Sequence, residues 1–377
     1  MNLADSLRPV REAAGKAAAD VDAHARFPLE AVTALRDSGL LGLTLPTDAG
    51  GLGGGPADLV EAVSQLAGVC GSAAMVYLMH VSAAMAVATA PPPGQQGLLK
   101  RLADGELLAT LALSETGSRS HFWAPVSQGE TVDGGVRLRV RKSFVTSAGH
   151  ADVYVVSTRT PANRAPADQP ASDLYVVFAT APGVAVAGPW RGLGLRGNAS
   201  APMSFDLVVP DADRLGAVGS GFGLKLQAVM PWFNLGNAAV SIGLARAALD
   251  AAIRHTGGAR LEHLGESLTQ LPTIRAQLAR TALDLAATRA YVDVAAASLA
   301  APDDATTLHV LGVKAVANDA ALRITDAAMR VCGGAAFAEH LQIERFFRDA
   351  RAGHVMAPTA DVLYDFYGKA ITGQPLF

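Results

Sequence analysis

The chain contains few cysteines, little excess of either charge and no long uninterrupted apolar run. Cys70 and Cys332 are its two cysteines, too few for a disulfide framework or a Cys-based metal site, so we expect neither. The 31 Lys and Arg residues nearly balance the 34 Asp and Glu residues, and no basic stripe could neutralise nucleic-acid phosphates. Gly, Pro, Asp or Arg residues interrupt the apolar runs before the roughly 18 residues that a membrane span needs. We therefore expect no nucleic-acid partner and no membrane span.

Targeting and nucleotide-binding signatures are also absent. Residues 1–24 alternate charged residues with alanine and lack the apolar centre of a secretory signal, so we expect a cytoplasmic protein. No GxGxxG sequence follows a predicted strand, and no Walker A sequence occurs. The sequence therefore does not favour a Rossmann dehydrogenase or a P-loop NTPase.

Hydrophobic periodicity divides the 377 residues into three parts. From residue 5 to about residue 90, apolar residues recur at the spacing of helices, whereas short runs rich in Val, Tyr, Phe and Leu between 107 and 211 have the period of strands. Helical spacing returns after residue 221 in three long stretches, which predict an antiparallel bundle. We predict an α+β multidomain protein with an N-terminal all-α domain (1–106), a central antiparallel β-barrel (107–215) and a C-terminal four-helix bundle (216–377).

Two segments have the composition of connections. Five glycines between residues 50 and 55 predict a flexible loop, after which Pro56 suits the first turn of a helix. The segment 161–173 contains three prolines and few bulky residues. We expect it to be a solvated excursion between two strands.

Five motifs, in this order, resemble segments of the acyl-CoA dehydrogenase superfamily of flavoproteins. FPLEAVTALRDSGLLGLTLPTDAGGLGG at 27–54 resembles the family's opening helices, and LALSETGSRS at 111–120 resembles its flavin-contacting TEPGAGS loop. RKSFVTSAGHADVYVV at 141–156 resembles the pattern GxKxWITNxxxAD. WRGLGLRGNASAPMSFDLVVP at 190–210 and CGGAAFAEHLQIERFFRDARAGHVMAPT at 332–359 are similar to the strand that enters the bundle and to the GGxGY and YRDAR stretch. The resemblance covers essentially the whole chain and implies a flavin-dependent oxidoreductase.

The resemblance implies a flavin site built mainly from the central part. A flavin needs hydrogen-bond donors along one edge, an apolar plate against one ring face and a group that holds its phosphate. The hydroxyl groups of SETGSRS are such donors, and its glycine lets the backbone approach closely. Strand alternation would place Phe144 and Thr146 on one face, as a ring beside a hydroxyl group. The residues assigned to the flavin by this resemblance are Leu113, Ser114, Gly117, Ser120, Phe144, Thr146 and Thr359.

In the family, a neighbouring subunit holds the adenosine end of FAD, and this chain matches that set in part. Arg260 stands one residue earlier than the family's arginine, Leu264 replaces its phenylalanine, and Arg330 replaces a glutamine. Gly333 and Gly334 match the paired glycines. Arg330 could bind a pyrophosphate or the single phosphate of FMN, or it could be a solvated cation at a helix end. We expect FAD, with FMN as the alternative, in a homotetramer or homodimer.

The carboxylate that the family uses as a base is missing. Dehydrogenation of an acyl thioester needs a carboxylate that removes the α proton while hydride leaves for the flavin. Alignment of the RDAR sequence places Ala357 at the usual glutamate position, and the alternative position on the first bundle helix holds Phe233. No Asp or Glu lies between residues 224 and 249. His354 could shuttle a proton instead, or it could be a histidine without catalytic duty.

The same departures resemble the flavin-dependent monooxygenases of this superfamily, such as dibenzothiophene monooxygenases and amino-sugar N-oxygenases. These enzymes use reduced flavin and oxygen and need no α-proton base. Pro358 matches the proline of their RTHTLHDP segment, although Gly353 and Met356 replace its two histidines. By this resemblance His80 and Ser147 are pocket groups, with a packed helix residue as the alternative for His80. The expected substrate-pocket walls are Met230, Trp232, Phe233 and Asn234.

Three functions follow from these observations. The first is an acyl-CoA dehydrogenase-like oxidoreductase that acts on an acyl-CoA or a related thioester. The second is a monooxygenase of the same fold, and the third is a catalytically silent flavin- or acyl-binding relative, against which the retained Ser114 and Thr146 argue. We also expect a flavin reductase or an electron-transfer partner.

Overall fold

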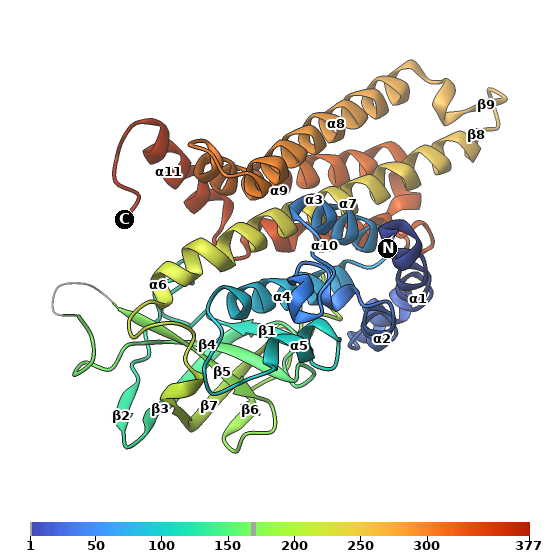
Figure 1. The fold of residues 1–377 in the computed structure, drawn as a ribbon. Coiled ribbons are helices and arrows are strands. Elements are labelled where there is room, and N and C mark those ends of the chain that lie inside the picture. The colour runs from blue at the N-terminus through green and yellow to red at the C-terminus, as the bar shows by residue number, and fades with distance from the viewer. Residues whose placement is uncertain (1, 167–170) are drawn as a thin grey trace.

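The computed structural model describes residues 2–166 and 171–377, and Figure 1 shows its helical, β and helical parts in chain order. The first part contains α1 (Leu3–His24), α2 (Leu29–Asp37), α3 (Pro56–Ala67), α4 (Gly71–Thr89) and α5 (Leu98–Ala103). The second contains β1 (Ala109–Ala112), β2 (Glu130–Val132), β3 (Gly135–Val145), β4 (Val153–Arg159), β5 (Ser172–Phe178), β6 (Val184–Val186) and β7 (Ala201–Pro210). The third contains α6 (Gly221–Leu224), a π-helical turn (Lys225–Val229), α7 (Met230–Gly258), a hairpin of β8 (Arg260–Leu261) and β9 (Glu266–Ser267), α8 (Pro272–Ala300), α9 (Thr306–Cys332), α10 (Ile343–Val355) and α11 (Ala360–Ile371). The predicted fold class is confirmed.

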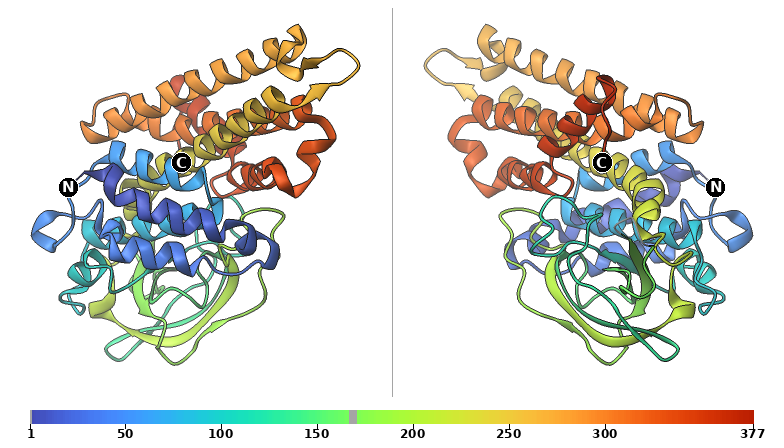
Figure 2. Two further views of the ribbon diagram at one scale, coloured as in Figure 1. Left: turned by 90° about the vertical axis from the view of Figure 1, so that its right-hand side faces the viewer. Right: turned by 90° about the vertical axis from the view of Figure 1, so that its left-hand side faces the viewer.

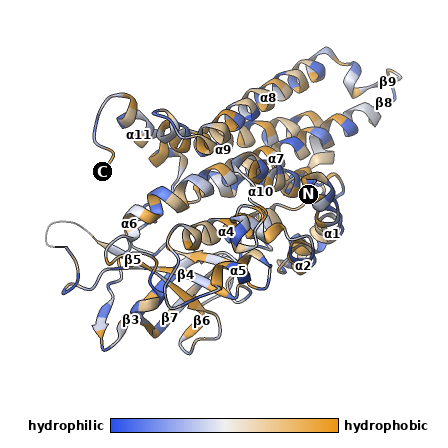
Figure 3. Cartoon of the chain, viewed as in Figure 1, coloured by the Kyte–Doolittle hydropathy of each residue, from blue (hydrophilic) through white to orange (hydrophobic). Residues whose placement is uncertain are grey.

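Helix α4 lies at the centre of the molecule, between β1 and α7 (Figures 1 and 2). Its 19 residues carry no charge, and Figure 3 colours it mainly as hydrophobic. Among the described residues, α4 is the one helix long and apolar enough to cross a membrane, so the expectation that every apolar run is interrupted earlier was wrong. However, 83% of that apolar window is buried inside the protein, as in the core helix of a globular fold.

The central part contains two sheets. Strands β2, β3, β7 and β6 form an antiparallel sheet in that order, and β1, β4 and β5 form the second. One pairing differs from the antiparallel prediction: β1 runs parallel to β4, with Ala109 opposite Val153. The reason is the long connection from β1 to β4 through β2 and β3, which returns the chain in the same direction. Tyr154, Phe205 and other buried side chains fill the space between the sheets.

The excursion expected at 161–173 does connect two strands, β4 and β5. Arg164 binds the Asp211 carboxylate at 2.5 Å, which holds the first part of the segment against the end of β7. Residues 167–170, on which the remainder of this expectation falls, lie outside the described residues.

The third part is a bundle in which α7, α8 and α9 are the long helices, with α10 packed on both α7 and α9. Helices α3 and α7 cross closely: a Cβ atom at Gly243 would lie 2.3 Å from the Ser64 carbonyl oxygen, so glycine is required there. One apolar core joins this bundle to the N-terminal helices, and a second joins α4 to β1, β4, β5 and α11. The three parts therefore share their cores.

Candidate active site

A cavity of about 1070 Å³ lies where the three parts of the chain meet. Residues of the central part line one side, from the segments 113–120, 143–146 and 190–200, and we call this side the β wall. A second group of lining residues, which we call the helical wall, comes from 348–359 together with Val229 and Phe233. Met75 and Met79 of α4 also line the cavity.

A buried ion pair supports the β wall. The Lys142 ammonium group lies 2.6 Å from the Glu115 carboxylate and also donates to the Leu113 carbonyl oxygen and the Ser157 hydroxyl group. Burial alone would raise the pKa of Glu115, but Lys142 and the donors of Ser127 outweigh it and hold that pKa below its ordinary value. Burial lowers the pKa of Lys142 to about 8, against the opposing effect of Glu115. The pair is therefore ionised at neutral pH and keeps the 113–115 backbone in place.

A β-bulge at the end of β3 brings Phe144 to the cavity. The register with β7 shifts between Lys142 and Val145, and Phe144 has a φ of 55°. Simple alternation, from which we expected Phe144 and Thr146 on one face, does not hold through such a bulge. Both residues nevertheless line the cavity, with the Phe144 ring 70% exposed and edge-on to Trp190 at 6.5 Å between ring centroids.

Hydroxyl groups gather along the β wall. Thr146 and Ser200 share a hydrogen bond of 2.9 Å between their hydroxyl oxygens, and Ser114 lines the cavity beside them. The Ser120 hydroxyl oxygen accepts a hydrogen bond from the Thr359 backbone N–H at 2.9 Å, so it ties the β wall to the helical wall. Of the seven residues assigned to the flavin, all except Gly117 line the cavity. A Cβ atom at Gly117 would instead approach Val126 to 3.0 Å, a packing reason for its glycine.

The helical wall presents one face of α10. Arg348, Arg351, Ala352 and Val355 line the cavity at the three- and four-residue spacing of a helix. Arg348 is paired with carboxylates, Asp22 at 2.5 Å and Glu344 at 2.7 Å. Arg351 instead lies over the Phe347 ring at 3.6 Å and donates to the Thr325 hydroxyl group at 3.0 Å. Burial lowers the pKa of Arg351, and the opposing effect of the Asp326 carboxylate is smaller.

The cavity carries unbalanced positive charge. Glu115, already paired with Lys142, is the one lining residue with a carboxylate in the described part of the chain. Arg119 and Arg351 also line the cavity, and neither forms a salt bridge with any described residue. A cavity of this charge favours a ligand with anionic groups.

The structure places Ala357, which the resemblance assigns to the position of the family's glutamate, in the cavity lining. His354 lies close in sequence but does not line the cavity. Its Nδ1 atom is 3.2 Å from an Asp319 oxygen, without the alignment of a hydrogen bond, and Asp319 also accepts from the Tyr364 hydroxyl group. The imidazole of His354 therefore faces α9 and α11, and the hypothesis that it replaces the missing base finds no support in this geometry.

His80 and Ser147 also lie outside the cavity lining. His80 is fully buried: its Nε2 atom is 3.0 Å from the Leu41 carbonyl oxygen, and its Nδ1 atom accepts from the Ala109 backbone N–H at 3.0 Å. Burial lowers the pKa of His80 to about 4. The pocket role proposed for His80 is therefore wrong, and the alternative of a packed helix residue holds. Ser147 is 1% exposed, and its hydroxyl group has no hydrogen-bond partner among the described residues.

One of the four residues expected as substrate-pocket walls lines the cavity, and it is Phe233. Val229 also lines the cavity, because it lies one helical turn before Phe233 and so on the same face. Residues 230, 232 and 234 lie on other faces. Met230 packs into a core, Trp232 packs against another, and Asn234 donates to the Val310 carbonyl oxygen at 2.8 Å.

The residues assigned to the adenosine end lie far from the β part of the chain. Arg260 belongs to the β8–β9 hairpin, which Figure 1 shows at the end of the bundle opposite the sheets. Its guanidinium group donates to the Gly265 carbonyl oxygen at 2.9 Å, and Leu264 is 55% exposed at the tip of that hairpin. Arg330 and the two glycines stand at the end of α9, with Gly333 at a φ of 58°. None of these residues lines the cavity.

Sequence reasoning missed several lining residues whose motifs it had singled out. Trp190, Gly194 and Leu195 come from the WRGLGLRG segment, and Arg351 and Met356 come from the stretch after it in the resemblance. Buried Asp349 fixes the first of these segments by accepting from the Leu195 backbone N–H at 2.6 Å, and burial raises the pKa of Asp349 to about 6. The sequence signal for this contact was Asp349 itself, a polar residue within an apolar face of the helix.

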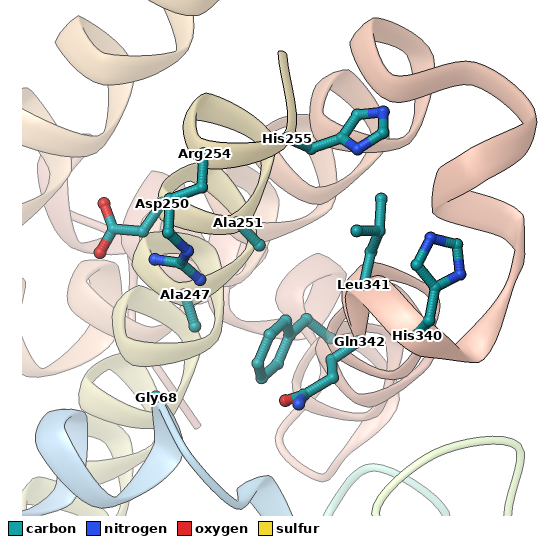
Figure 4. Close-up of a pocket in the computed structure, with 10 residues that line it drawn as sticks. Gly68, Ala247, Asp250, Ala251, Arg254, His255, His340, Leu341 and Gln342 are labelled. Carbon is teal, nitrogen blue, oxygen red and sulfur yellow. The ribbon is translucent and has the colours of Figure 1, made fainter. Parts of the chain in front are cut away.

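A second cavity, of about 470 Å³, opens at the other end of α7. Figure 4 shows Ala247, Arg254 and His255 of α7 on one side and His340 and Gln342 on the other. None of the residues predicted as functional lines it.

The fold and the large cavity define a class of flavoprotein oxidoreductases, and comparison with protein families agrees. The models described as acyl-CoA dehydrogenase N-terminal, middle and C-terminal domains match residues 3–106, 110–208 and 219–372. This chain belongs to the acyl-CoA dehydrogenase family.

Individual relatives cover nearly the whole chain. Cyclohex-1-ene-1-carbonyl-CoA dehydrogenase of Geobacter metallireducens is 28% identical over 97% of this chain and 96% of that protein. Acryloyl-CoA reductase (NADH) of Anaerotignum propionicum is 28% identical over 94% of this chain and 88% of that protein. The structure of butyryl-CoA dehydrogenase from Megasphaera elsdenii superimposes with a TM-score of 0.91 at 23% identity, covering 99% and 98% of the two chains.

The residues of the large cavity fit the flavin that this family implies. The Ser114 hydroxyl group and one hydroxyl group of the Thr146–Ser200 pair can donate to a ring edge, and the exposed Phe144 ring offers an apolar face. Arg119 and Arg351 can hold phosphate oxygens, since their guanidinium groups have no carboxylate partner among the described residues. The β wall therefore matches the needs of the ring, and the free guanidinium groups match those of the phosphates.

Proposed function

We propose that this protein is an FAD-dependent oxidoreductase that acts on an acyl-CoA or a related acyl thioester. The observation that carries the proposal is the cavity, which joins a hydroxyl-lined edge, an exposed aromatic ring and two unpaired guanidinium groups. Its volume of about 1070 Å³ is at the upper end of small-molecule sites, roughly 300 to 1000 Å³, so it can take a flavin and a substrate together. The names of the relatives, which are CoA-thioester oxidoreductases, support the substrate class.

In this proposal the two walls have different duties. The β wall binds and orients the cofactor through Ser114, Thr146 and Ser120, while Phe144 shields one ring face from water. The flavin, when bound, supplies the acceptor for hydride. The helical wall covers the substrate side, where Ala357 and Met356 exclude water but offer no group that can take a proton.

The location of the adenosine-end residues supports a homotetramer or homodimer. Arg260, Leu264 and Arg330 lie at the bundle end remote from the sheets, so a flavin in the cavity of one copy would meet these residues of another. In the same proposal the cofactor exchanges electrons with a flavin reductase or an electron-transfer partner, FAD is preferred over FMN, and the protein is cytoplasmic.

A monooxygenase of the same fold is the second candidate function, and one observation favours it. Glu115 is the one carboxylate among the described lining residues, and it is committed to Lys142. Flavin-dependent oxygenation needs no base at the α carbon of a thioester, whereas dehydrogenation does. The chemistry of the helical wall therefore decides between the two candidates.

The absorbance spectrum of the purified protein tests the first proposal, combined with the mass of the released cofactor and the molar mass of the assembly. We expect the bands of an oxidised flavin, the mass of FAD and a dimer or tetramer. A colourless monomer that takes up neither FAD nor FMN when either is added would contradict the proposal.

Two reactions separate the candidates. A dehydrogenase bleaches its flavin when mixed anaerobically with its acyl-CoA, and Ala357→Glu should create or strengthen that reaction with saturated acyl-CoAs. A monooxygenase with reduced flavin and oxygen instead yields a product heavier by one oxygen atom, which mass spectrometry detects. Oxygen insertion by the unmodified protein, without bleaching by any acyl-CoA, would favour the monooxygenase function over the dehydrogenase function.

A further inference from the structure

A buried lysine lies directly behind the helical wall. Lys314 belongs to α9 and is 0% exposed. Its Nζ atom donates to three backbone carbonyl oxygens, those of Gly353 at 2.9 Å, Met356 at 3.1 Å and Pro358 at 2.8 Å. An ammonium group has three N–H donors, so these carbonyls use all of them.

This arrangement has no carboxylate to offset the charge. Lys314 forms no salt bridge with the described residues, and burial lowers the pKa of Lys314 to about 7. Removing an ammonium group from water is costly, and here carbonyl dipoles alone compensate. The Gly353 carbonyl belongs to the last turn of α10, where helix carbonyls lack helical partners and a cation is favourable. The contacts of Lys314 with Gly353, Met356 and Pro358 therefore join α9 to the backbone of residues 353–358.

Neighbouring polar groups also bind at the Gly353 carbonyl group. Asn318, one turn along α9, donates to the Gly353 carbonyl oxygen at 2.8 Å, and Ser241 of α7 donates to the Asn318 side-chain oxygen at 2.7 Å. A Cβ atom at Gly353 would lie 2.6 Å from that Asn318 oxygen, so this approach requires glycine. Helices α7 and α9 therefore both anchor the end of α10.

The other end of the segment is in direct contact with the β wall. The Thr359 backbone N–H donates to the Ser120 hydroxyl oxygen of the β wall at 2.9 Å. Ala357 lies between the Met356 and Pro358 carbonyls that bind Lys314, and both Met356 and Ala357 line the cavity. The segment is thus fixed on both sides of the position aligned with the family's glutamate.

We propose that Lys314 is a positioning residue of this site, which holds the backbone of residues 353–358 so that Met356 and Ala357 keep their place against the cofactor and substrate. The proposal rests on the proposed function for what occupies the cavity, but the clamp itself consists of contacts within the chain. Lys314 acts only through backbone carbonyls, so the wall keeps its shape whichever side chain residue 357 carries. This explains how the helical wall can lose its carboxylate and remain ordered.

Lys225 provides a matched control. It is also 0% exposed, burial also lowers its pKa to about 7, and its Nζ atom donates to the Trp123 carbonyl oxygen and the Ser172 hydroxyl group. It has no hydrogen bond to residues 353–359. Lys314→Met and Lys225→Met therefore remove the same kind of buried cation from different places.

The experiment compares these two variants by hydrogen exchange, flavin affinity and visible spectrum. For Lys314→Met we expect amide exchange in the peptide 353–359 to quicken by roughly tenfold or more, and flavin affinity to fall by roughly tenfold with altered visible bands. Lys225→Met should keep wild-type exchange in that peptide. Lys314→Gln, which keeps N–H donors without charge, should lie between wild type and Lys314→Met, and it replaces Lys314→Met if that variant does not fold.

Unchanged exchange at 353–359 in the Lys314 variants, or equal changes in Lys225→Met, would overturn the proposal. Hydrogen exchange is read on the protein without added flavin, so it decides the role of Lys314 even if the wild type binds none. Failure of the wild type to bind flavin would instead contradict the proposed function. The two failures are therefore distinguishable.

Discussion

The two walls of the cavity present different residues, and the proposed function gives them different roles. The β wall presents hydroxyl groups and an aromatic ring on a backbone fixed by the Lys142–Glu115 pair. The helical wall presents Ala357 and Met356 on a backbone fixed by Lys314. In the proposed function, the cofactor side and the substrate side therefore lie on separate segments, and each segment is held by its own buried lysine.

The largest effect should follow removal of the β-wall support. Lys142→Met leaves the Glu115 carboxylate buried without its partner, which typically costs about 3 to 5 kcal/mol of stability. Denaturant unfolding measures this loss. The double variant Lys142→Met, Glu115→Gln should recover a large part of it, and single and double variants of equal stability would contradict the role assigned to the pair.

His80 accepts a hydrogen bond at the start of β1 and does not line the cavity, and the pH dependence of stability should report on its burial. Burial lowers the pKa of His80 to about 4, so between pH 6.5 and pH 4 the unfolded chain binds a proton that the folded chain does not. Stability present above pH 6.5 is therefore lost as the pH falls toward 4, by on the order of 3 kcal/mol. Urea unfolding of wild type and His80→Gln across this range should show a shallower decline in the variant. Equal declines would mean that His80 does not titrate as its burial implies.

Variants of two arginines should distinguish contacts to the phosphate that FAD and FMN share from contacts to the adenosine end of FAD. Arg351→Met removes a cavity cation, so FAD and FMN should both bind more weakly, by about 1.5 to 3 kcal/mol for a charge-assisted contact, while riboflavin affinity stays unchanged. Arg330→Ala should weaken FAD and leave FMN unaffected, because Arg330 lies outside the cavity. Calorimetric titration of the apoprotein with the three flavins measures both effects. A weakened FMN in Arg330→Ala would instead favour FMN as the natural cofactor.

The smallest effect concerns the tie between the walls. Ser120→Ala removes the acceptor of the Thr359 backbone N–H, a loss of about 1 kcal/mol, and should reduce flavin affinity severalfold. Ser38→Ala is the control, since Ser38 lies outside the cavity lining and its hydroxyl group donates to the Leu35 carbonyl oxygen within its own turn. If both variants bind flavin equally well, the tie contributes nothing to the site.

Periodicity and motifs sufficed for the order of helices and strands, and six of the seven residues assigned to the flavin line the cavity. Ser114, Ser120, Thr146 and Thr359 could be predicted because they lie within short motifs whose backbone brings them to one place. Phe144 was placed in the cavity for an incorrect reason, since a bulge with positive φ, and not strand alternation, directs it there.

The remainder depended on packing between segments distant in sequence. Met230, Trp232 and Asn234 share a helix with Phe233, but the sequence does not state which face of that helix meets the cavity. His80 and His354 are chemically able to move protons, and only the fold shows that one is sealed behind β1 and the other faces Asp319. Lys314 had no motif of its own, because its partners are backbone carbonyls 39 to 44 residues away.

Exchange of the α protons of acyl-CoA thioesters in deuterated water tests the central claim most directly, because it reports proton abstraction at the helical wall without requiring net oxidation. The flavin-loaded wild type and Ala357→Glu would be incubated with a series of acyl-CoAs, and deuterium uptake measured by mass spectrometry. We expect no uptake with the wild type and measurable uptake with Ala357→Glu for at least one chain length. Rapid uptake with the wild type would show that a base acts in this cavity and would contradict the account.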